Sequence, residues 1–211
     1  MTKKILITGA NGQLGHEMRN ALKGNNRFEC IFTDVAELDI CNAEAVKQTI
    51  ADNHIDYIVN CAAYTQVDKA EDNAELCRKI NTDAVENLAR AAATYGARMI
   101  HISTDYVFNG RGYRPYTEAM TPDPQSVYGS TKLEGEKILT DICPESIIIR
   151  TAWLYSPYGN NFVKTMLHLG KEREELSVVS DQIGTPTCAA DLAQAILVIL
   201  QADTFVPGTY H

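Results

Sequence analysis

Short runs of apolar and β-branched residues recur from the N-terminus to about residue 155 and alternate with segments of helical periodicity. The runs are apolar at consecutive positions, as in KILIT and SIII, which is typical of parallel strands buried on both faces. We expect strands at residues 4–9, 28–34, 56–63, 98–104 and 146–155, and helices at residues 14–24, 43–53, 81–96 and 128–141. This alternation predicts an α/β protein with a Rossmann-type, doubly wound parallel sheet.

The pattern changes after residue 155. SPYGNN has the Pro and Gly content of a loop, and beyond it we expect a helix at 162–172, an extended run at 176–187 and a helix at 191–202. We therefore expect a Rossmann domain at residues 1–155. A smaller, incomplete region at residues 156–211 should lie near the C-terminal edge of the sheet, where α/β proteins bind ligands, with about 188–202 packing back on the first domain.

Composition narrows the functional classes. With 211 residues, 45% of them apolar, the chain is long enough to bury one sizeable core. The net charge of −8 and the lack of a basic stripe argue against a nucleic-acid partner. No segment has the length of a membrane span, and the first apolar run stops at Gly9, too early for a signal peptide, so we expect a cytoplasmic protein with no membrane partner.

The six cysteines form no Cys-x-x-Cys pair and no metal-ligand spacing with the five histidines. We therefore expect free, structural cysteines and derive no metal site from the residue pattern.

Three glycines follow the first expected strand directly. Gly9, Gly12 and Gly15 open the first expected helix, where glycines allow a tight turn and a close backbone approach to a pyrophosphate. A purely structural turn is the alternative. The position between strand and helix favours dinucleotide binding, and the Gly-x-x-Gly-x-x-Gly spacing is typical of one branch of Rossmann proteins.

Asp34 ends the second expected strand. A carboxylate there can accept hydrogen bonds from an adenosine ribose, and it repels a 2′-phosphate. No Lys or Arg follows within DVAELDI. This arrangement favours NADH over NADPH, although an Asp that closes a strand is also a common turn residue.

A Ser-Thr pair and a Tyr-Lys pair are predicted to meet at the same edge of the sheet. Ser103 and Thr104 end a central strand, and Tyr128 and Lys132 lie one helical turn apart in YGSTK. Such a Tyr-Lys spacing arises easily by chance, so the context decides. Reduction by hydride needs a proton donor, and a neighbouring ammonium can lower the pKa of a Tyr, ~10 when free. A hydroxyl from Thr104 can orient the carbonyl.

Several motifs together resemble the extended short-chain dehydrogenase/reductase superfamily: the glycine turn, NCAAYTQVDKAE, HISTDYVF and YGSTK. More narrowly, ILITGANGQLG, STDYVFNG, YGSTKLEGE, RTAWLY, NNFVKTML and DQIGTPT resemble the dTDP-4-dehydrorhamnose reductase family. The similarity runs from end to end.

The resemblance implies roles for individual residues. Thr104, Tyr128 and Lys132 match a catalytic triad in which Tyr128 donates the proton and Lys132 also holds the nicotinamide ribose. Thr104, Asp105 and Trp153 match substrate contacts. Besides Gly9, Gly15, Tyr128 and Lys132, the matching cofactor positions are Asn11, Gly12, Gln13, Leu14, Asp34, Asp39, Ile40, Ala62, Ala63 and Tyr64.

The activity that the resemblance implies is NAD(P)H-dependent reduction of dTDP-4-dehydro-β-L-rhamnose to dTDP-β-L-rhamnose, a precursor of bacterial surface polysaccharide. The resemblance is also compatible with a bound Mg²⁺ and with a homodimer. Two alternatives stay open. One is another nucleotide-sugar epimerase or dehydratase of the superfamily, although Asp105 has no adjacent Glu for elimination. The other is a non-catalytic, dinucleotide-binding regulatory subunit like that of methionine adenosyltransferase.

Other residues have structural interpretations. Trp153 could fill a gap between the sheet and a covering helix, and Asp105 could be a turn acid. His101 is expected to be a hydrogen-bonded core residue rather than a base. Asn81 could cap a helix or touch the cofactor.

The C-terminal segment of the chain bears on substrate binding. Members of the resembling family continue past FVPGTYH. Lys164 and Lys171 are the only nearby candidate cations for the diphosphate, and both are more naturally interpreted as exposed helix charges. We therefore expect this chain to be a truncated form that binds NADH well and its sugar nucleotide poorly, with an apolar patch exposed beside residues 196–200.

Overall fold

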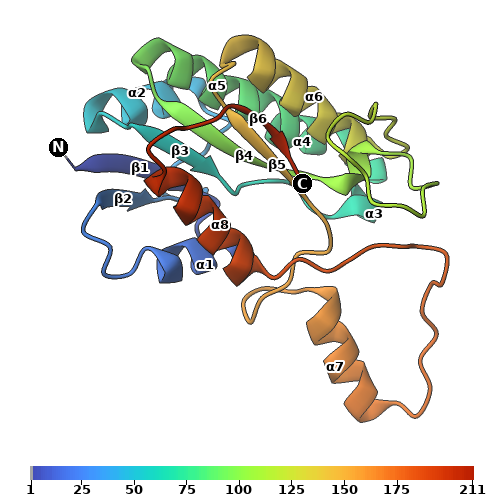
Figure 1. Cartoon of the computed structure of the whole chain (residues 1–211). Coiled ribbons are helices and arrows are strands. Elements are labelled where there is room, and N and C mark those ends of the chain that lie inside the picture. Colours follow the sequence, from blue (N-terminus) through green and yellow to red (C-terminus); the bar gives the residue numbers. More distant parts are fainter. Residues whose placement is uncertain (1) are drawn as a thin grey trace.

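Six strands pair in parallel in the order β2-β1-β3-β4-β5-β6 in the computed structural model, which describes residues 2–211 (Figure 1). The strands are β1 (Lys3–Thr8), β2 (Phe28–Phe32), β3 (Tyr57–Asn60), β4 (Arg98–Thr104), β5 (Ile147–Thr151) and β6 (Gly208–Tyr210). The order reverses at β1, because β2 lies on one side of it and β3 on the other. Ligands bind at such switch points. The expected fold class is confirmed.

Helices cover both faces of the sheet (Figure 1). One face carries α2 (Ala43–Asn53), α5 (Ala84–Tyr95) and α6 (Val127–Ile142), and the other carries α1 (Gln13–Ala21) and α8 (Ala189–Gln201). Consecutive residues of β1 serve different faces: Leu6 joins the first core, whereas Ile5 and Ile7 join the second. Each strand therefore needs apolar side chains on both faces, which explains why the strand sequences do not alternate.

Helical structure between β3 and β4 starts earlier than the sequence indicates. Two short helices, α3 (Val67–Asp72) and α4 (Ala74–Arg78), lead into a π-helical turn, η1 (Lys79–Asp83), and then into α5. Asn81 lies inside that turn and is buried, so it does not cap α5. A 3₁₀ turn, η2 (Asp105–Val107), follows β4.

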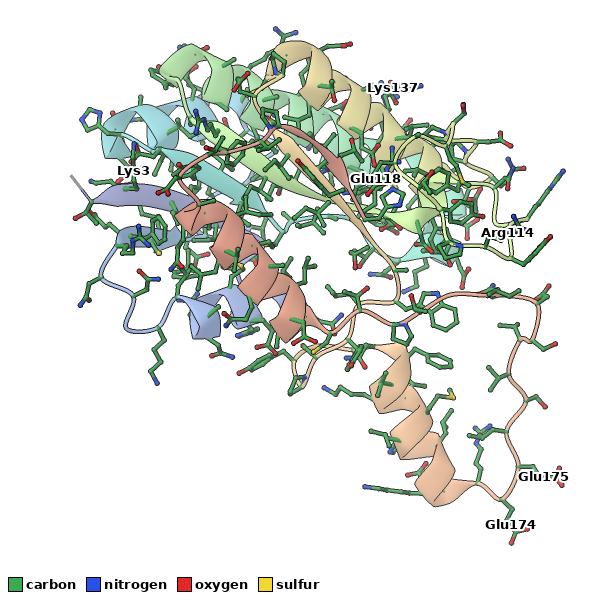
Figure 2. All side chains as sticks on the ribbon, in the orientation of Figure 1. Lys3, Arg114, Glu118, Lys137, Glu174 and Glu175 are labelled. Atoms are coloured by element: carbon green, nitrogen blue, oxygen red, sulfur yellow. The ribbon has the colours of Figure 1, made fainter. Side chains whose placement is uncertain are left out.

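The first part of the region after β5 projects from the body of the molecule (Figure 1). Residues 157–187, which we call the arm, contain α7 (Phe162–Glu172) followed by a segment without helix or strand. No residue of α7 is buried. Glu174 and Glu175 point outward at the far end of the arm (Figure 2). The arm is therefore held only at its two ends.

The chain returns from the arm through a bridge between Tyr155 and Cys188 and enters α8, which packs on the sheet. Ile196, Leu197 and Leu200 are buried there, so the patch expected beside residues 196–200 is reduced to Val198 and its neighbours. Exposed apolar side chains gather instead on the arm, at Phe162, Leu167, Leu176, Val178, Val179 and Ile183.

All six cysteines are free, as expected. Among residues 2–211, no helix is both long and apolar enough to cross a membrane.

Candidate active site

A cavity of about 1270 Å³ opens at the C-terminal edge of the sheet, at the switch point between β1 and β3. This volume exceeds the roughly 300–1,000 Å³ of a typical small-molecule site, so the cavity has room for two ligands. The expected site residues that line it are Gly9, Asn11, Gly12, Gln13, Leu14, Asp34, Asp39, Ile40, Ala62, Ala63, Thr104, Asp105, Tyr128, Lys132 and Trp153.

The glycine turn lies between β1 and α1. Gly9 has a φ of +63°, and a Cβ on it would lie 2.6 Å from the backbone nitrogen of Ala62. A Cβ on Gly15 would lie 2.4 Å from the carbonyl oxygen of Gly9, so Gly15 closes the turn from behind and does not line the cavity. Gly12 is the N-cap of α1 and offers no capping side chain. The first amides of α1 are thus left for an anion, which fits a dinucleotide pyrophosphate.

Asp34 follows β2 and faces the same cavity. Its carboxylate accepts hydrogen bonds from the backbone N–H groups of Asn11 and Val35, both at 2.9 Å. These bonds tie the end of β2 to the glycine turn. Asp39 instead accepts from the backbone N–H of Cys41 at 2.9 Å, at the entry to α2.

The loop after β3 forms another wall of the cavity. Ala62 and Ala63 line it, whereas Tyr64 does not. The backbone of Tyr64 is bound by the buried amide of Asn81, which accepts from its N–H at 2.9 Å and donates to its carbonyl at 3.1 Å. Asn81 therefore supports the loop from behind, and its amide is not available to a cofactor.

Thr104, Tyr128 and Lys132 meet where β4 and α6 converge. The Thr104 hydroxyl accepts from the backbone N–H of Tyr106 and donates to Asp105, each at 3.2 Å. A Cβ on Gly129 would lie 2.2 Å from the carbonyl oxygen of Tyr106, so only glycine lets α6 approach η2 this closely. That contact sets Tyr128 beside Thr104.

Burial dominates the electrostatics of these side chains. It raises the pKa of Tyr128 to about 12, against an opposing hydrogen bond with Thr104, and it lowers the pKa of Lys132 to about 8. The expected lowering of the Tyr128 pKa by the Lys132 ammonium is thus not seen. Lys132 Nζ instead donates to the carbonyl oxygen of Ile102 at 2.7 Å, and burial of the phenol is the largest influence on the Tyr128 pKa. Tyr128 is held as a neutral phenol, the form that can donate a proton.

Trp153 and Asp105 lie at the cavity as well. Trp153 adopts a left-handed backbone conformation with a φ of +47°, which is uncommon outside glycine and marks a constrained position. Its ring lies 5.8 Å from that of Phe162, and a Cβ on Gly184 would lie 3.4 Å from it, so Trp153 joins the cavity to the arm rather than filling a gap beneath a helix. Burial raises the pKa of the Asp105 carboxyl.

The cavity also contains residues to which the sequence motifs assign no role. Asn161 caps α7 and donates from Nδ2 to Gln13 Oε1 at 2.8 Å, so it links the arm to the glycine turn. Lys69 and Lys79 are basic residues that line the cavity. Only the α3-to-η1 fold brings them there, so no local signal identifies them. Other unanticipated lining residues are Val35, Leu38, Cys41, Thr65, Gln66, Val67, Leu76, Ile80, Thr151 and Gly159.

Comparison with known proteins supplies the family. A family model described as the RmlD substrate binding domain matches residues 3–211. The dTDP-4-dehydrorhamnose reductase of Aggregatibacter actinomycetemcomitans is 43% identical over 99% of this chain and 72% of its own length. That of Escherichia coli K12 is 48% identical over 98% of this chain and 71% of its own.

Solved structures agree. A dTDP-4-dehydrorhamnose reductase from Clostridium acetobutylicum matches with a TM-score of 0.94 and 51% identity, over 99% of this chain and 73% of its own. The Bacillus anthracis enzyme in complex with NADP matches with a TM-score of 0.95 and 44% identity, over 100% of this chain and 74% of its own. The expected family is therefore confirmed: the chain belongs to the dTDP-4-dehydrorhamnose reductase family.

Proposed function

We propose that the chain catalyses the NAD(P)H-dependent reduction of dTDP-4-dehydro-β-L-rhamnose to dTDP-β-L-rhamnose. The observation that carries this proposal is that Thr104, Tyr128 and Lys132 share one cavity with the glycine turn. Membership of the dTDP-4-dehydrorhamnose reductase family supports the choice of substrate.

The chain's own residues would manage the proton and the orientation of the ketone. Bound NAD(P)H supplies the hydride. Tyr128, held as a neutral phenol, donates its proton to the ketone oxygen, and the Thr104 hydroxyl hydrogen-bonds that oxygen as charge develops. Lys132 in its ammonium form would stabilise the resulting phenolate and bind the nicotinamide ribose.

A nicotinamide dinucleotide fits the rest of the cavity. The uncapped N-terminus of α1 suits the pyrophosphate, and Asp34 suits the adenosine ribose. We propose NADH as the preferred form, because the Asp34 carboxylate would repel a 2′-phosphate. The relative from Bacillus anthracis was solved with NADP, so this preference needs its own measurement.

The sugar nucleotide would occupy the part of the cavity near Asp105 and Trp153. Across residues 2–211, no group of three or more His, Cys, Asp or Glu side chains is placed to hold a metal ion. A role for Mg²⁺ and pairing into a homodimer stay predictions, as does a cytoplasmic location.

The test is a turnover assay with NADH or NADPH and dTDP-4-dehydro-β-L-rhamnose. We expect loss of the reduced dinucleotide matched mole for mole by formation of dTDP-β-L-rhamnose. Binding of dinucleotide without oxidation would contradict the proposal and favour the regulatory-subunit alternative. Consumption of a nucleotide hexose by loss of water, without net dinucleotide oxidation, would favour the dehydratase alternative instead.

A further inference from the structure

A chain of buried polar side chains runs through the sheet beneath the cavity, and the proposed reaction does not use most of it. It starts at Thr8 at the end of β1, passes Asn60 on β3 and His101 on β4, and reaches Lys132 on α6. Asn60 and His101 are fully buried and Lys132 almost so. Buried polar groups pair donor with acceptor, so the direction of each bond can be worked out.

Two hydrogen-bond donors fix the orientation of the Asn60 side-chain amide. The backbone N–H of Ala62 can only donate, and it lies 3.2 Å from Asn60 Oδ1. The Thr8 hydroxyl lies 2.7 Å from the same atom. The amide oxygen of Asn60 must therefore face Thr8 and Ala62. The NH₂ group of Asn60 must then face His101, with Nδ2 at 3.0 Å from Nδ1 of the ring.

An NH₂ group can only donate, so His101 Nδ1 must accept and carries no proton. Burial, with the nearby charge of Lys132, holds the pKa of His101 well below its usual range, so the ring is neutral. A neutral imidazole has one proton, which must lie on Nε2. That N–H faces Lys132 Nζ at 3.2 Å.

The chain of donors ends on an amine. An ammonium group has no lone pair, so a charged Lys132 would set two donors against each other. A neutral amine can accept from His101 and still donate to the carbonyl oxygen of Ile102 at 2.7 Å. The opposite ring tautomer would suit the ammonium, but it would set the Nδ1 proton against the Asn60 NH₂ group.

The other groups around Lys132 do not reverse this preference. Glu136, on the same helix, acts to raise the pKa of Lys132, but it is held in a buried ion pair with Arg150 of β5 at 2.6 Å. Cys77 of α4 acts in the same direction and Tyr128 is a neutral phenol. Burial lowers the pKa of Lys132 and is the largest of these influences.

We propose that His101 is a positioning residue that stabilises the neutral amine of Lys132, through a proton held on Nε2 by Asn60, and so sets the pH at which Lys132 gains its charge. The effect of this charge state on catalysis rests on the proposed function, because the charge of Lys132 matters to the reaction only if its ammonium stabilises the Tyr128 phenolate and binds the ribose. The tautomer and the titration of Lys132 are properties of the protein alone.

The tautomer can be observed directly by ¹⁵N NMR of the imidazole in the whole chain, without added ligand. We expect His101 to keep a single proton, on Nε2, between about pH 6 and 9. An unperturbed His would become an imidazolium near the acid end of that range. A proton on Nδ1, or an imidazolium near pH 6, would overturn the proposal. Thr8→Val is the matched control: it removes a contact to Asn60 but leaves the Ala62 N–H in place, so the tautomer should not change.

The titration of Lys132 is followed in the same samples with ¹⁵N-labelled lysine, assigned by loss of its signal in Lys132→Met. Asn60→Asp offers an acceptor to Nδ1, so it should move the proton to Nδ1 and raise the Lys132 pKa by ~1 unit or more, part of which comes from the new charge. His101→Gln adds no charge, and its amide oxygen can turn toward the ammonium. It should raise the pKa as well.

If His101→Gln leaves the Lys132 pKa unchanged or lowers it, the proposal is wrong whatever Asn60→Asp does. Should either variant fail to fold, the tautomer of the unaltered chain still decides. An inactive protein with the expected tautomer and titration would remove the reductase proposal and leave this one standing. Full reductase activity with the proton on Nδ1 would support the reductase proposal and overturn this one.

Discussion

The two walls of the cavity are built differently. The wall formed by β1, β3, β4 and α6 is lined largely by buried side chains, and the hydrogen bonds of Asn60 and of Asn81 in η1 brace it from behind. Among the described residues of this wall, Ser103 Oγ on β4 is buried without a hydrogen-bond partner. The wall formed by the arm has no buried residue in α7, and residues 171–186 are all exposed. Its main direct tie to the glycine turn is the bond from Asn161 to Gln13. The dinucleotide side is therefore preorganised, and the substrate side is not.

Helices α7 and α8 show how little an apolar pattern says about packing. Both contain several large apolar residues and lie in the same region of the chain. In α8, Leu192, Ile196 and Leu200 are buried against the sheet, whereas in α7 Leu167 is largely exposed and Phe162 half exposed. An amphipathic pattern predicts a helix, but burial depends on a partner surface elsewhere in the fold.

The largest effect is expected at the dinucleotide side. Tyr128→Phe keeps the packed ring and removes the proton donor, so turnover should fall by ~10²–10⁴-fold while dinucleotide affinity stays nearly intact. Steady-state kinetics and a dinucleotide titration check this. Tyr57→Phe, at the opposite end of the sheet, is the control and should retain activity. Near-normal turnover in Tyr128→Phe would place the proton donor elsewhere.

Truncating one apolar side chain in each helix measures the contrast in packing. Ile196→Ala opens a cavity in the core and should lower the free energy of unfolding by about 2–5 kcal/mol. Leu167→Ala, 64% exposed on α7, should change it by no more than about 0.5 kcal/mol. Urea unfolding followed by circular dichroism gives both values. Equal losses would mean that α7 is packed against a surface in solution.

Glycines allow the same comparison for the backbone. In Gly15→Ala the new methyl would meet the carbonyl oxygen of Gly9, which should cost about 1–3 kcal/mol and weaken dinucleotide binding. In Gly170→Ala nothing lies within 4 Å, and the exposed helix should gain about 0.5–1 kcal/mol. Thermal unfolding with and without NADH distinguishes them. A Gly15→Ala protein that binds NADH normally would show that the turn tolerates displacement.

The smallest expected effect concerns cofactor choice. We expect NADH to bind more tightly than NADPH, and Asp34→Ala to narrow the difference by relieving repulsion of the 2′-phosphate. The gain should be modest, because the variant also loses the hydrogen bond from the Asn11 backbone. Titration of both dinucleotides against both proteins measures it. Equal affinities in the unaltered chain would show that Asp34 does not face the 2′ position.

The strands and the main helices could be predicted because their signals are local. Continuous apolar runs marked β1 to β5, and the glycine turn and the YGSTK motif marked the edge of the sheet that forms the cavity. β6 was missed because three residues, GTY, carry no strand pattern; pairing with β5 makes it a strand. The π-helical turn at Asn81 was missed because it depends on long-range contacts with Tyr64 and the close approach to Gly135.

The charge states in the site could not be predicted from spacing. The Tyr-Lys spacing suggested that Lys132 would lower the pKa of Tyr128, but burial and the bond to Ile102 are properties of the folded chain. Burial of His101 was expected. Its contact with Asn60 depends on the pairing of β3 with β4, and its contact with Lys132 depends on the packing of α6 against β4.

The contrast between the two walls is tested most directly by calorimetric titration of the chain with NADH and, separately, with dTDP-β-L-rhamnose. A preorganised dinucleotide side predicts NADH binding with a Kd on the order of micromolar or tighter, and an unpacked arm predicts a Kd for the sugar nucleotide at least roughly tenfold weaker, a difference of about 1.4 kcal/mol. Sugar-nucleotide binding as tight as that of NADH would contradict the account, because the arm would then already form a complete substrate site.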